Sequence, residues 1–177
     1  MTKTPANLLR VLLVRHAHAA WALPGMRDFD RPLDQRGREE VERLAVTMSV
    51  NALVPGLVYC SSAKRCAETL DILVSRLGIS PPVEHTSALY SETHQTYLDL
   101  IESDRARQSG SVMIVGHNPM IEDTALCLLQ GDPQAGEDAL GSGFPTAGLF
   151  IADYSTDRDP AASGRTRFVG LLSPVDA

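Results

Sequence analysis

The sequence is poor in the features that mark secreted, membrane-spanning or zinc-binding proteins. It has three cysteines in 177 residues, Cys60, Cys66 and Cys127, and no CxxC pair. An odd number of cysteines inside apolar patterns indicates reduced core residues rather than a disulfide framework or a zinc site. No apolar run approaches the roughly 20 residues that a membrane helix requires, and the first residues do not resemble a signal peptide. We therefore expect a cytoplasmic protein that has no membrane as a partner.

An excess of basic residues is also missing. The 16 Lys and Arg residues are outnumbered by 22 Asp and Glu residues, so the formal net charge is -6. This balance argues against nucleic acid as a general partner. A hydrophobic content of 44% is ordinary for a globular protein, and the length predicts a single domain over residues 1–177.

Short apolar runs alternate with amphipathic stretches along the chain. This alternation predicts an α/β fold, with βα units around a mostly parallel sheet and helices on both faces. The predicted strands are 8–14, a run from Gly56, 83–85, 111–116, 147–154 and 167–172. The predicted helices are 34–49, a segment that ends at Gly78, 93–107, and one with Asn118 as N-cap and Pro119 as first residue. The Gly- and Pro-rich stretch 131–145 is predicted to be a mobile loop.

Three of the strongest predicted strands end in polar residues of one kind. Arg15 and His16 follow the first strand, Arg65 follows the second, and His117 follows the strand that ends at Gly116. Ligands of open α/β sheets bind beyond the carboxyl ends of the strands, where helix N-termini also attract anions. Two arginines and two histidines, with no matching carboxylate at these strand ends, have the composition of a phosphate-binding site.

Such a site can transfer a phosphoryl group without a metal ion or cofactor. A neutral imidazole can act as the nucleophile and form a phosphohistidine intermediate, which water then hydrolyses. Nearby guanidinium groups keep that imidazole unprotonated and stabilise the charge that develops on the phosphoryl oxygens. The residue pattern therefore predicts a phosphatase with no cofactor.

Four motifs in this order carry a resemblance to a known family. The segments "LLVRHAHAAW", "DFDRPLDQRG", "SSAKRCAET" and "VGHNP" resemble the histidine phosphatase superfamily, and "FPTAG" continues the match. More narrowly, they resemble its short SixA-type phosphohistidine phosphatases. The resemblance implies a three-layer α/β/α sandwich of the phosphoglycerate mutase-like kind. It also implies a phosphorylated protein, such as a phosphotransfer domain, as the partner.

The resemblance also implies a role for individual residues. It makes His16 the nucleophile, Arg15 and Arg65 phosphate clamps, and His117 the second imidazole of the pocket. Arg31, in "FDRPL", matches another arginine near the phosphate.

Two further residues are predicted at the same site. Asn118 is a phosphate-binding residue in this interpretation. Family members often have a carboxylate as general acid at the position of Ser91 in "ALYSET", so Glu92, the next residue, is the candidate for the acid. Phosphohistidine needs less help from an acid than an alkoxide leaving group does.

His18 and Trp21, which follow the first motif, fit structural roles. His18 is expected at the surface or pocket rim, and Trp21 is expected to pack under the loop. A metal site is not expected, because H-E-x-x-H is absent. Three rival functions nevertheless stay open for this sequence. They are a small-molecule phosphomonoester phosphatase of the same superfamily, a catalytically weak phospho-binding module and a metal-dependent hydrolase.

Overall fold

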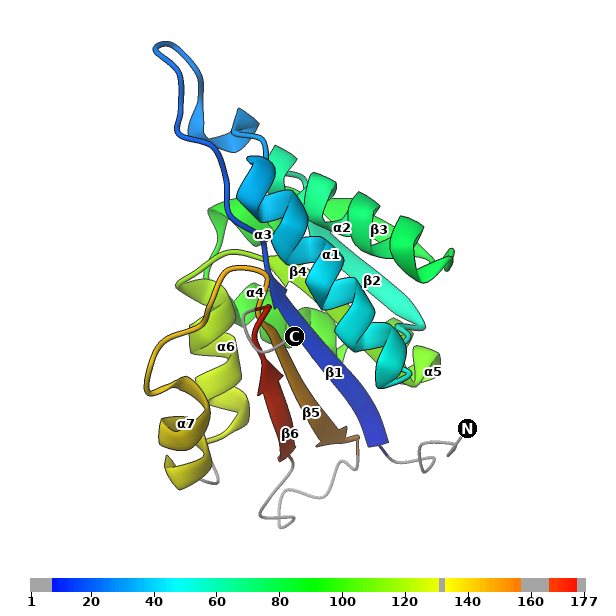
Figure 1. Cartoon of the computed structure of the whole chain (residues 1–177). Helices are drawn as coiled ribbons and strands as arrows, with labels where there is room; N and C mark the ends of the chain where they lie inside the picture. Colours follow the sequence, from blue (N-terminus) through cyan, green and yellow to red (C-terminus); the bar gives the residue numbers. More distant parts are fainter. Residues whose placement is uncertain (1–7, 131–132, 157–165, 175–177) are drawn as a thin grey trace.

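One six-stranded sheet organises the protein, in a computed structural model that describes residues 8–130, 133–156 and 166–174. The strand order is β3-β2-β4-β1-β5-β6 (Figure 1). The strands are β1 (Leu8–Arg15), β2 (Leu57–Ser61), β3 (Val83–Thr86), β4 (Ser111–Gly116), β5 (Leu149–Ser155) and β6 (Thr166–Leu172). The first four in chain order pair in parallel, whereas β5 runs antiparallel to both β1 and β6. The prediction of a mostly parallel sheet is confirmed.

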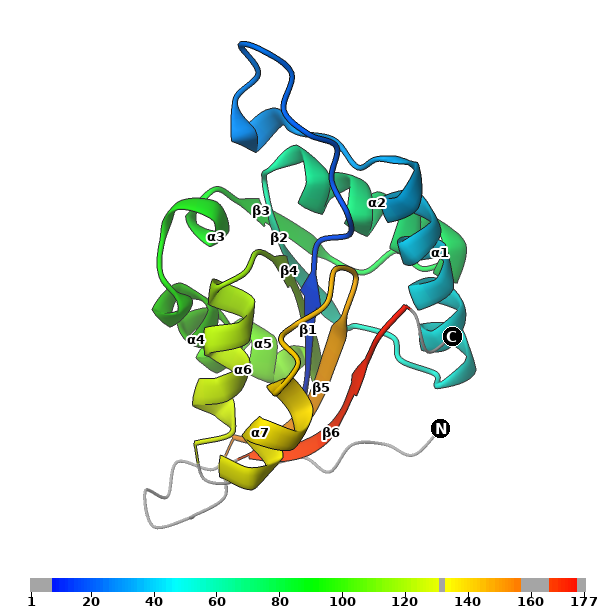
Figure 2. The ribbon, with the colours of Figure 1, turned by 60° about the vertical axis from the view of Figure 1, so that its left-hand side comes forward.

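Helices cover both faces of this sheet. On one face lie α1 (Gln35–Val50) and α2 (Lys64–Leu77), which pack side by side. The other helices are α3 (Ala88–Ser91), α4 (His94–Glu102), α5 (Asp104–Ser109), α6 (Met120–Leu128) and α7 (Pro133–Leu140), and the 3-10 turn η1 is Asp28–Asp30. Figure 2 shows α4, α5 and α6 on the face away from α1. The predicted three-layer α/β/α sandwich is therefore the fold of this chain.

The central strand β1 explains why the sheet needs helices on both sides. Leu9, Val11 and Leu13 point into the core beneath α4 and α6, whereas Leu12 and Val14 point into the core beneath α1 and α2. All five side chains are fully buried. A strand buried on both faces reads as a continuous apolar run, as this one does. The polar residues at its end are thus held by a rigid strand.

The start of α1 is fixed against the segment that leaves β1. The Asp34 side chain caps the helix by accepting a hydrogen bond from the N–H of Gly37 at 2.8 Å. A Cβ at Gly37 would lie 2.0 Å from the carbonyl oxygen of His18, so only glycine fits there. This close approach anchors the chain just beyond the β1 edge.

Several local predictions were wrong. The helix predicted over 93–107 is two helices, because Ser103 is extended and its side chain caps α5 by accepting from the N–H of Ala106. The stretch predicted as a loop over 131–145 contains α7. Asn118 is not the N-cap of α6. That position is taken by Pro119, so the helix begins at Met120.

Two side chains lie elsewhere than predicted. Trp21 does not pack under a loop but is 87% exposed. Cys60 and Cys66 are buried, as predicted, but Cys127 is only partly so. Within the described residues, no helix is both long enough and apolar enough to cross a bilayer.

Candidate active site

Three neighbouring strands, β2, β4 and β1, bring the predicted residues to one edge of the sheet. His16 follows directly after β1, His117 follows directly after β4, and Arg65 lies in the first turn of α2, which follows β2. The His16 and His117 ring centroids are 5.2 Å apart. Because parallel strands all end at the same edge, the Arg65 side chain contacts both His16 and His117, which are 49 and 52 positions away from it in sequence.

The Arg65 guanidinium is the centre of this cluster. Its Nε donates to His16 Nε2 at 3.1 Å, and its Nη2 donates to His117 Nδ1 at 3.2 Å. It also donates to Asp28, through Nη1 to the carbonyl oxygen at 2.7 Å and through Nη2 to Oδ2 at 3.0 Å. Only 7% of the Arg65 side chain is exposed. The guanidinium is thus held in one orientation by three residues.

These contacts define the tautomers of both rings, because arginine can donate but cannot accept. His16 Nε2 must be an acceptor, so the ring proton is on Nδ1, which donates to the Ala17 carbonyl at 2.8 Å. His117 Nδ1 is likewise an acceptor. Its Nε2 then carries the proton and lies 2.8 Å from Ser61 Oγ. Each histidine therefore directs a lone pair toward Arg65 and accepts a hydrogen bond from it.

Burial and nearby positive charge keep both rings neutral. Burial is the main cause that lowers the pKa of His16 to about 4. The hydrogen bond to Ala17 raises this pKa, whereas the positive charges of three arginines lower it further, namely Arg65, Arg15 and Arg31. For His117, burial is again the main cause, followed by His16 and Arg65, and the pKa falls to about 3. Both imidazoles are unprotonated at neutral pH.

Asp28 is a site residue that the sequence analysis missed. Its carboxylate accepts hydrogen bonds from Arg31 Nη1 at 2.9 Å, from Arg65 Nη2 and, at 3.1 Å, from the Tyr90 hydroxyl. The hydrogen bond from Arg31 is the largest cause that lowers the pKa of this carboxyl to about 2. Arg31 therefore reaches the cluster through Asp28. No carboxylate stands at the described ends of β1, β2 and β4, as the sequence indicates, and Asp28 reaches the arginines from η1 instead.

Tyr90 closes another side of the cluster and was also missed. Its ring packs edge-on against His117, with centroids 5.3 Å apart, and edge-on against Phe29 at 5.0 Å. The Arg65 guanidinium carbon lies 5.8 Å from the centroid of the same ring. Asp28 belongs to the "DFDRPL" segment that the motif analysis singled out for Arg31, so a signal existed for it. Tyr90 likewise belongs to the "ALYSET" segment, which the motif analysis singled out for Glu92.

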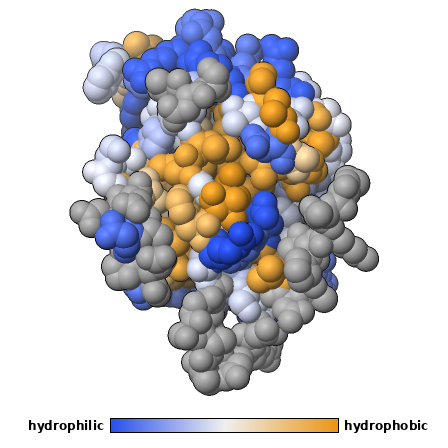
Figure 3. Space-filling model, turned by 60° about the horizontal axis from the view of Figure 1, so that its bottom comes forward, coloured by the Kyte–Doolittle hydropathy of each residue, from blue (hydrophilic) through white to orange (hydrophobic). Residues whose placement is uncertain are grey.

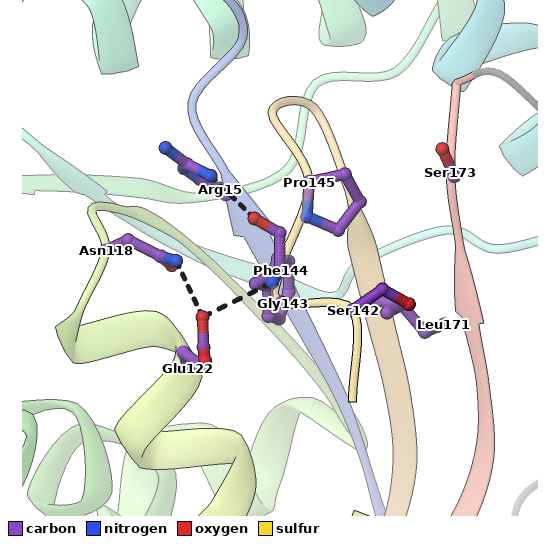
Figure 4. Close-up of a pocket in the computed structure, with 9 residues that line it drawn as sticks. All are labelled: Arg15, Asn118, Glu122, Ser142, Gly143, Phe144, Pro145, Leu171 and Ser173. Carbon is purple, nitrogen blue, oxygen red and sulfur yellow. Dashed lines mark hydrogen bonds between the residues drawn. The ribbon is translucent and has the colours of Figure 1, made fainter. Parts of the chain in front are cut away.

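Arg15 lines a pocket of about 580 Å³ together with Asn118, Glu122 and Phe144 (Figure 4). Its Nη1 donates to the Phe144 carbonyl at 2.6 Å, whereas its buried Nε has no partner among the described residues. Glu122 Oε2 accepts from Phe144 N at 3.2 Å and from Asn118 Nδ2 at 2.8 Å. Glu122 thus ties the start of α6 to the segment that orients Arg15. It is the second carboxylate that the sequence analysis missed.

The structure does not bring Glu92 into contact with these residues. This residue follows α3 as its C-cap, is exposed, and accepts a hydrogen bond from the Thr96 hydroxyl at 2.7 Å. His18 lies outside the cluster, at the rim, where its Nδ1 is 2.6 Å from Asp34 Oδ2. In the part of the chain that the structure describes, no group of three or more His, Cys, Asp or Glu side chains is arranged to hold a metal ion.

A mostly parallel α/β sheet with neutral histidines and arginines at its carboxyl edge defines a class of enzymes that bind phosphorylated substrates there. Comparison with known proteins narrows that class. The family model "Histidine phosphatase superfamily (branch 1)" matches residues 11–90. A crystal structure of a protein assigned as the phosphohistidine phosphatase SixA of Agrobacterium tumefaciens is 36% identical, with a TM-score of 0.80 over 93% of this chain and 97% of that one. The chain belongs to the histidine phosphatase superfamily, and it is a phosphatase.

More distant likenesses extend the comparison. An uncharacterized chloroplastic protein of Arabidopsis thaliana is 28% identical over 127 residues, which are 67% of this chain and 58% of that protein. The present chain therefore spans a little over half of that relative's length. A mycobacterial glucosyl-3-phosphoglycerate phosphatase shares the fold, with a TM-score of 0.61, 16% identity and coverage of 91% of this chain and 97% of the other. SixA-like proteins and small-molecule phosphatases thus share this architecture.

Proposed function

We propose that this phosphatase dephosphorylates phosphohistidine on another protein, without a metal ion, through a phosphohistidine intermediate on His16. The observation that carries the proposal is the His16 ring itself. Its Nδ1 proton is held by the Ala17 carbonyl, so Nε2 presents a lone pair beside the Arg65 guanidinium. A nucleophile needs such a lone pair, and the ring keeps it because its pKa is about 4.

In the first step the substrate phosphoryl group replaces Asp28 as the anion held by Arg65. Arg65, Arg15 and Arg31 donate to the phosphoryl oxygens, and Arg65 Nε releases the Nε2 lone pair of His16. That lone pair forms a bond to phosphorus while the bond from phosphorus to the substrate imidazole breaks, and this ring, already protonated on its other nitrogen, leaves as neutral imidazole. The arginines stabilise the charge on the equatorial oxygens.

In the second step water attacks the phosphorus and the N–P bond to His16 breaks. The water protons end on the released phosphate and in solvent, and His16 recovers its neutral form. His117 accepts from Arg65 through Nδ1, and its protonated Nε2 lies 2.8 Å from Ser61 Oγ, so this ring positions the Arg65 guanidinium that binds the phosphoryl group. Asn118, the next residue, is proposed to bind the phosphate through its Nδ2 once that group leaves Glu122, because its unpartnered Oδ1 can only accept a hydrogen bond.

The leaving group decides how much acid catalysis the first step needs. Asp28 has a pKa of about 2 and is therefore ionised, so it cannot supply a proton at neutral pH. Glu92, the predicted acid, would first have to leave Thr96. An imidazole leaving group needs less protonation than an alkoxide does, so a site without an acid in contact favours an N–P substrate.

A small phosphomonoester is the second candidate substrate. The pocket of about 580 Å³ beside Arg15 is large enough for a small organic group, and Glu122 gives it a polar wall. A binding module without turnover is not retained, because the chain is a phosphatase by family. Three free cysteines, two of them buried, support a cytoplasmic setting for either substrate.

The experiment that tests the proposal measures phosphate release from a phosphorylated histidine phosphotransfer domain in the presence of a chelator. His16→Ala is expected to abolish release, whereas His18→Ala, two residues away and bound to Asp34, is expected to retain it. Alkaline quenching during turnover is expected to trap an acid-labile phosphoryl group on the wild type and none on His16→Ala. Release that requires an added metal ion, or that survives in His16→Ala, would contradict the mechanism. If the enzyme cleaves an aryl phosphate but not the phosphorylated protein, small phosphoesters are the substrates instead.

A further inference from the structure

A projecting arm (residues 20–31) rises from the rim of the phosphate site. It leaves β1, extends beyond the rest of the molecule and returns to α1 (Figures 1 and 2). Its tip (residues 21–26, "WALPGM") has no charged residue, and residues 21–25 are all exposed. Trp21 is 87% exposed and Leu23 66% exposed. A contiguous exposed apolar segment of this kind is typical of an interaction site.

The base of the arm is held firmly, so the tip is not exposed merely because the segment lacks structure. Ala19 and Leu33 form an antiparallel bridge, and the Ala20 N–H donates to the Pro32 carbonyl at 2.9 Å. Arg31 Nε donates to the Ala20 carbonyl at 2.8 Å. These bonds join the two sides of the arm at its base and leave the apolar side chains of the tip in water.

The tip turns back through a short hydrogen-bonded loop. The Met26 N–H donates to the Leu23 carbonyl at 2.9 Å, and Gly25 has a φ of +83°, which favours glycine. The Arg27 and Asp30 side chains then pair at 2.6 Å where the chain returns. The shape of the tip is therefore set by its own backbone and not by packing of Trp21.

The arm is continuous with the phosphate site. Asp28 and Arg31 belong to the arm, and they contact each other and, through Asp28, Arg65. A phosphoryl group bound by Arg65 and Arg31 therefore lies next to the base of the arm. A small phosphorylated molecule in that site would not cover a tip that projects into solvent. A folded protein with its phosphohistidine in the site would extend along the arm and bury the tip.

We propose that the tip docks onto the surface of the phosphorylated protein, against apolar side chains beside its phosphohistidine, and selects protein substrates over small ones. This inference rests on the proposed function and names the surface by which the substrate is recognised. Large aromatic side chains at the centre of an interface commonly dominate its affinity. Trp21 is expected to be that residue, with Leu23 beside it.

The kinetic test compares two substrates with the same scissile bond, a phosphorylated histidine phosphotransfer domain and free phosphohistidine. Trp21→Ala with Leu23→Ser is expected to lower kcat/KM for the protein by about 10-fold or more, mainly through KM, as removal of a hot spot does. The value for free phosphohistidine is expected to stay unchanged, and Trp21→Phe to restore most of the loss. Val50→Ser is the matched control, because Val50 is 80% exposed at the far end of α1.

A second measurement uses the only tryptophan of the chain as its own reporter. Trp21 emission in the His16→Ala variant is expected to shift to shorter wavelength when a tryptophan-free phosphorylated phosphotransfer domain is added. Neutral lipid vesicles are expected to cause no shift. A shift with vesicles but not with the protein would overturn the proposal in favour of a lipid surface. Figure 3 shows another apolar area, on the face turned forward from the lower end of the molecule in Figure 1. The Val50→Ser control tests whether the loss of any exposed apolar side chain lowers activity on the protein substrate.

The remaining outcomes separate this inference from the proposed function. Equal losses on both substrates would overturn it, because the arm would then serve the site and not the partner. No loss on either substrate would overturn it as well. If the wild type releases no phosphate from the protein, the proposed function fails instead. If the wild type releases it and the tip variant does so equally well, only the docking role fails.

Discussion

Two aspartates of this protein each bridge two arginines, at opposite ends of β1. Asp28 accepts from Arg31 and Arg65 near the carboxyl end of the strand. Asp153, opposite Arg10 in the β1–β5 ladder, accepts from Arg10 at 2.6 Å and from Arg167. The Asp153 side chain is 4% exposed, whereas that of Asp28 is 51% exposed. The same three-residue ion cluster thus occurs in two environments.

The difference lies in what else the arginines contact. At Asp153, the carboxylate is enclosed between strands β1, β5 and β6, and each of its oxygens accepts from one arginine. At Asp28, the carboxylate reaches solvent, and Arg65 also donates to the lone pairs of two histidines. In the proposed mechanism a phosphoryl group replaces Asp28 there, whereas the Asp153 side chain is only 4% exposed. The enclosed cluster is therefore expected to be structural, whereas the cluster beside His16, the proposed nucleophile, is open to a substrate.

The largest expected effect comes from weakening the cluster at the active site. Arg65→Lys removes the planar guanidinium that serves His16, His117 and Asp28 at once. We expect kcat/KM to fall by about 100- to 1000-fold, the range for loss of a preorganised charge stabiliser. The measurement is steady-state hydrolysis of an aryl phosphate and of a phosphorylated phosphotransfer domain. Arg76→Lys, on the exposed end of the same helix, is the control, and a loss under about tenfold would contradict the central role of Arg65.

The enclosed cluster is expected to respond in stability and not in activity. Asp153→Asn leaves the charges of Arg10 and Arg167 without their carboxylate. We expect the free energy of unfolding to fall by about 2–3 kcal/mol, less than for a fully buried pair because Arg167 is largely exposed. Urea denaturation measures this, with Asp99→Asn, an exposed carboxylate bound to Gln95, as control. A drop in kcat at temperatures where the variant is folded would break the comparison between the two clusters.

A smaller effect is expected from Glu122, which acts on Arg15 through Phe144. Glu122→Ala removes the hydrogen bonds that Glu122 accepts from Phe144 N and Asn118 Nδ2. The Phe144 carbonyl, which accepts from Arg15, is then positioned less firmly. We expect KM for a phosphorylated substrate to rise about tenfold with little change in kcat, the pattern for lost ground-state binding. Glu122→Gln keeps an acceptor oxygen and should recover most of that affinity. A purely structural role would instead lower the unfolding midpoint and leave KM unchanged.

The last expected effect is a pH dependence that follows from the neutral histidines. Because burial lowers the pKa of His16 to about 4 and that of His117 to about 3, both rings should stay neutral at pH 5, as ring NMR can measure. In the unfolded chain both rings protonate near pH 6.5, so that state binds more protons below that pH. Stability should therefore decrease as pH falls from about 6.5, down to about 4 for the contribution of His16 and about 3 for that of His117. A His16→Asn variant should show a shallower decrease, and ring protonation near pH 6.5 would refute the effect of burial.

The sequence pattern predicted the parallel core of the fold and the meeting of His16, Arg65 and His117. Those predictions rested on periodicity, which is a local property, and on the rule that parallel strands share an edge. They were less successful where the chain is not periodic. The extended conformation of Ser103 divided a predicted helix, and Trp21 proved exposed because the arm is shaped by hydrogen bonds at its base.

The sequence by itself determined which residues stand at the strand ends, since a strand buried on both faces must be apolar until it leaves the sheet. It also determined the family, through four motifs in order. Only the tertiary structure decided which carboxylates join the arginines, because Asp28 and Glu122 lie on a turn and a helix whose distance from Arg65 and Arg15 has no signature in sequence spacing. It also decided the protonation of the two histidines, because their tautomers and lowered pKa values depend on what surrounds each ring in three dimensions.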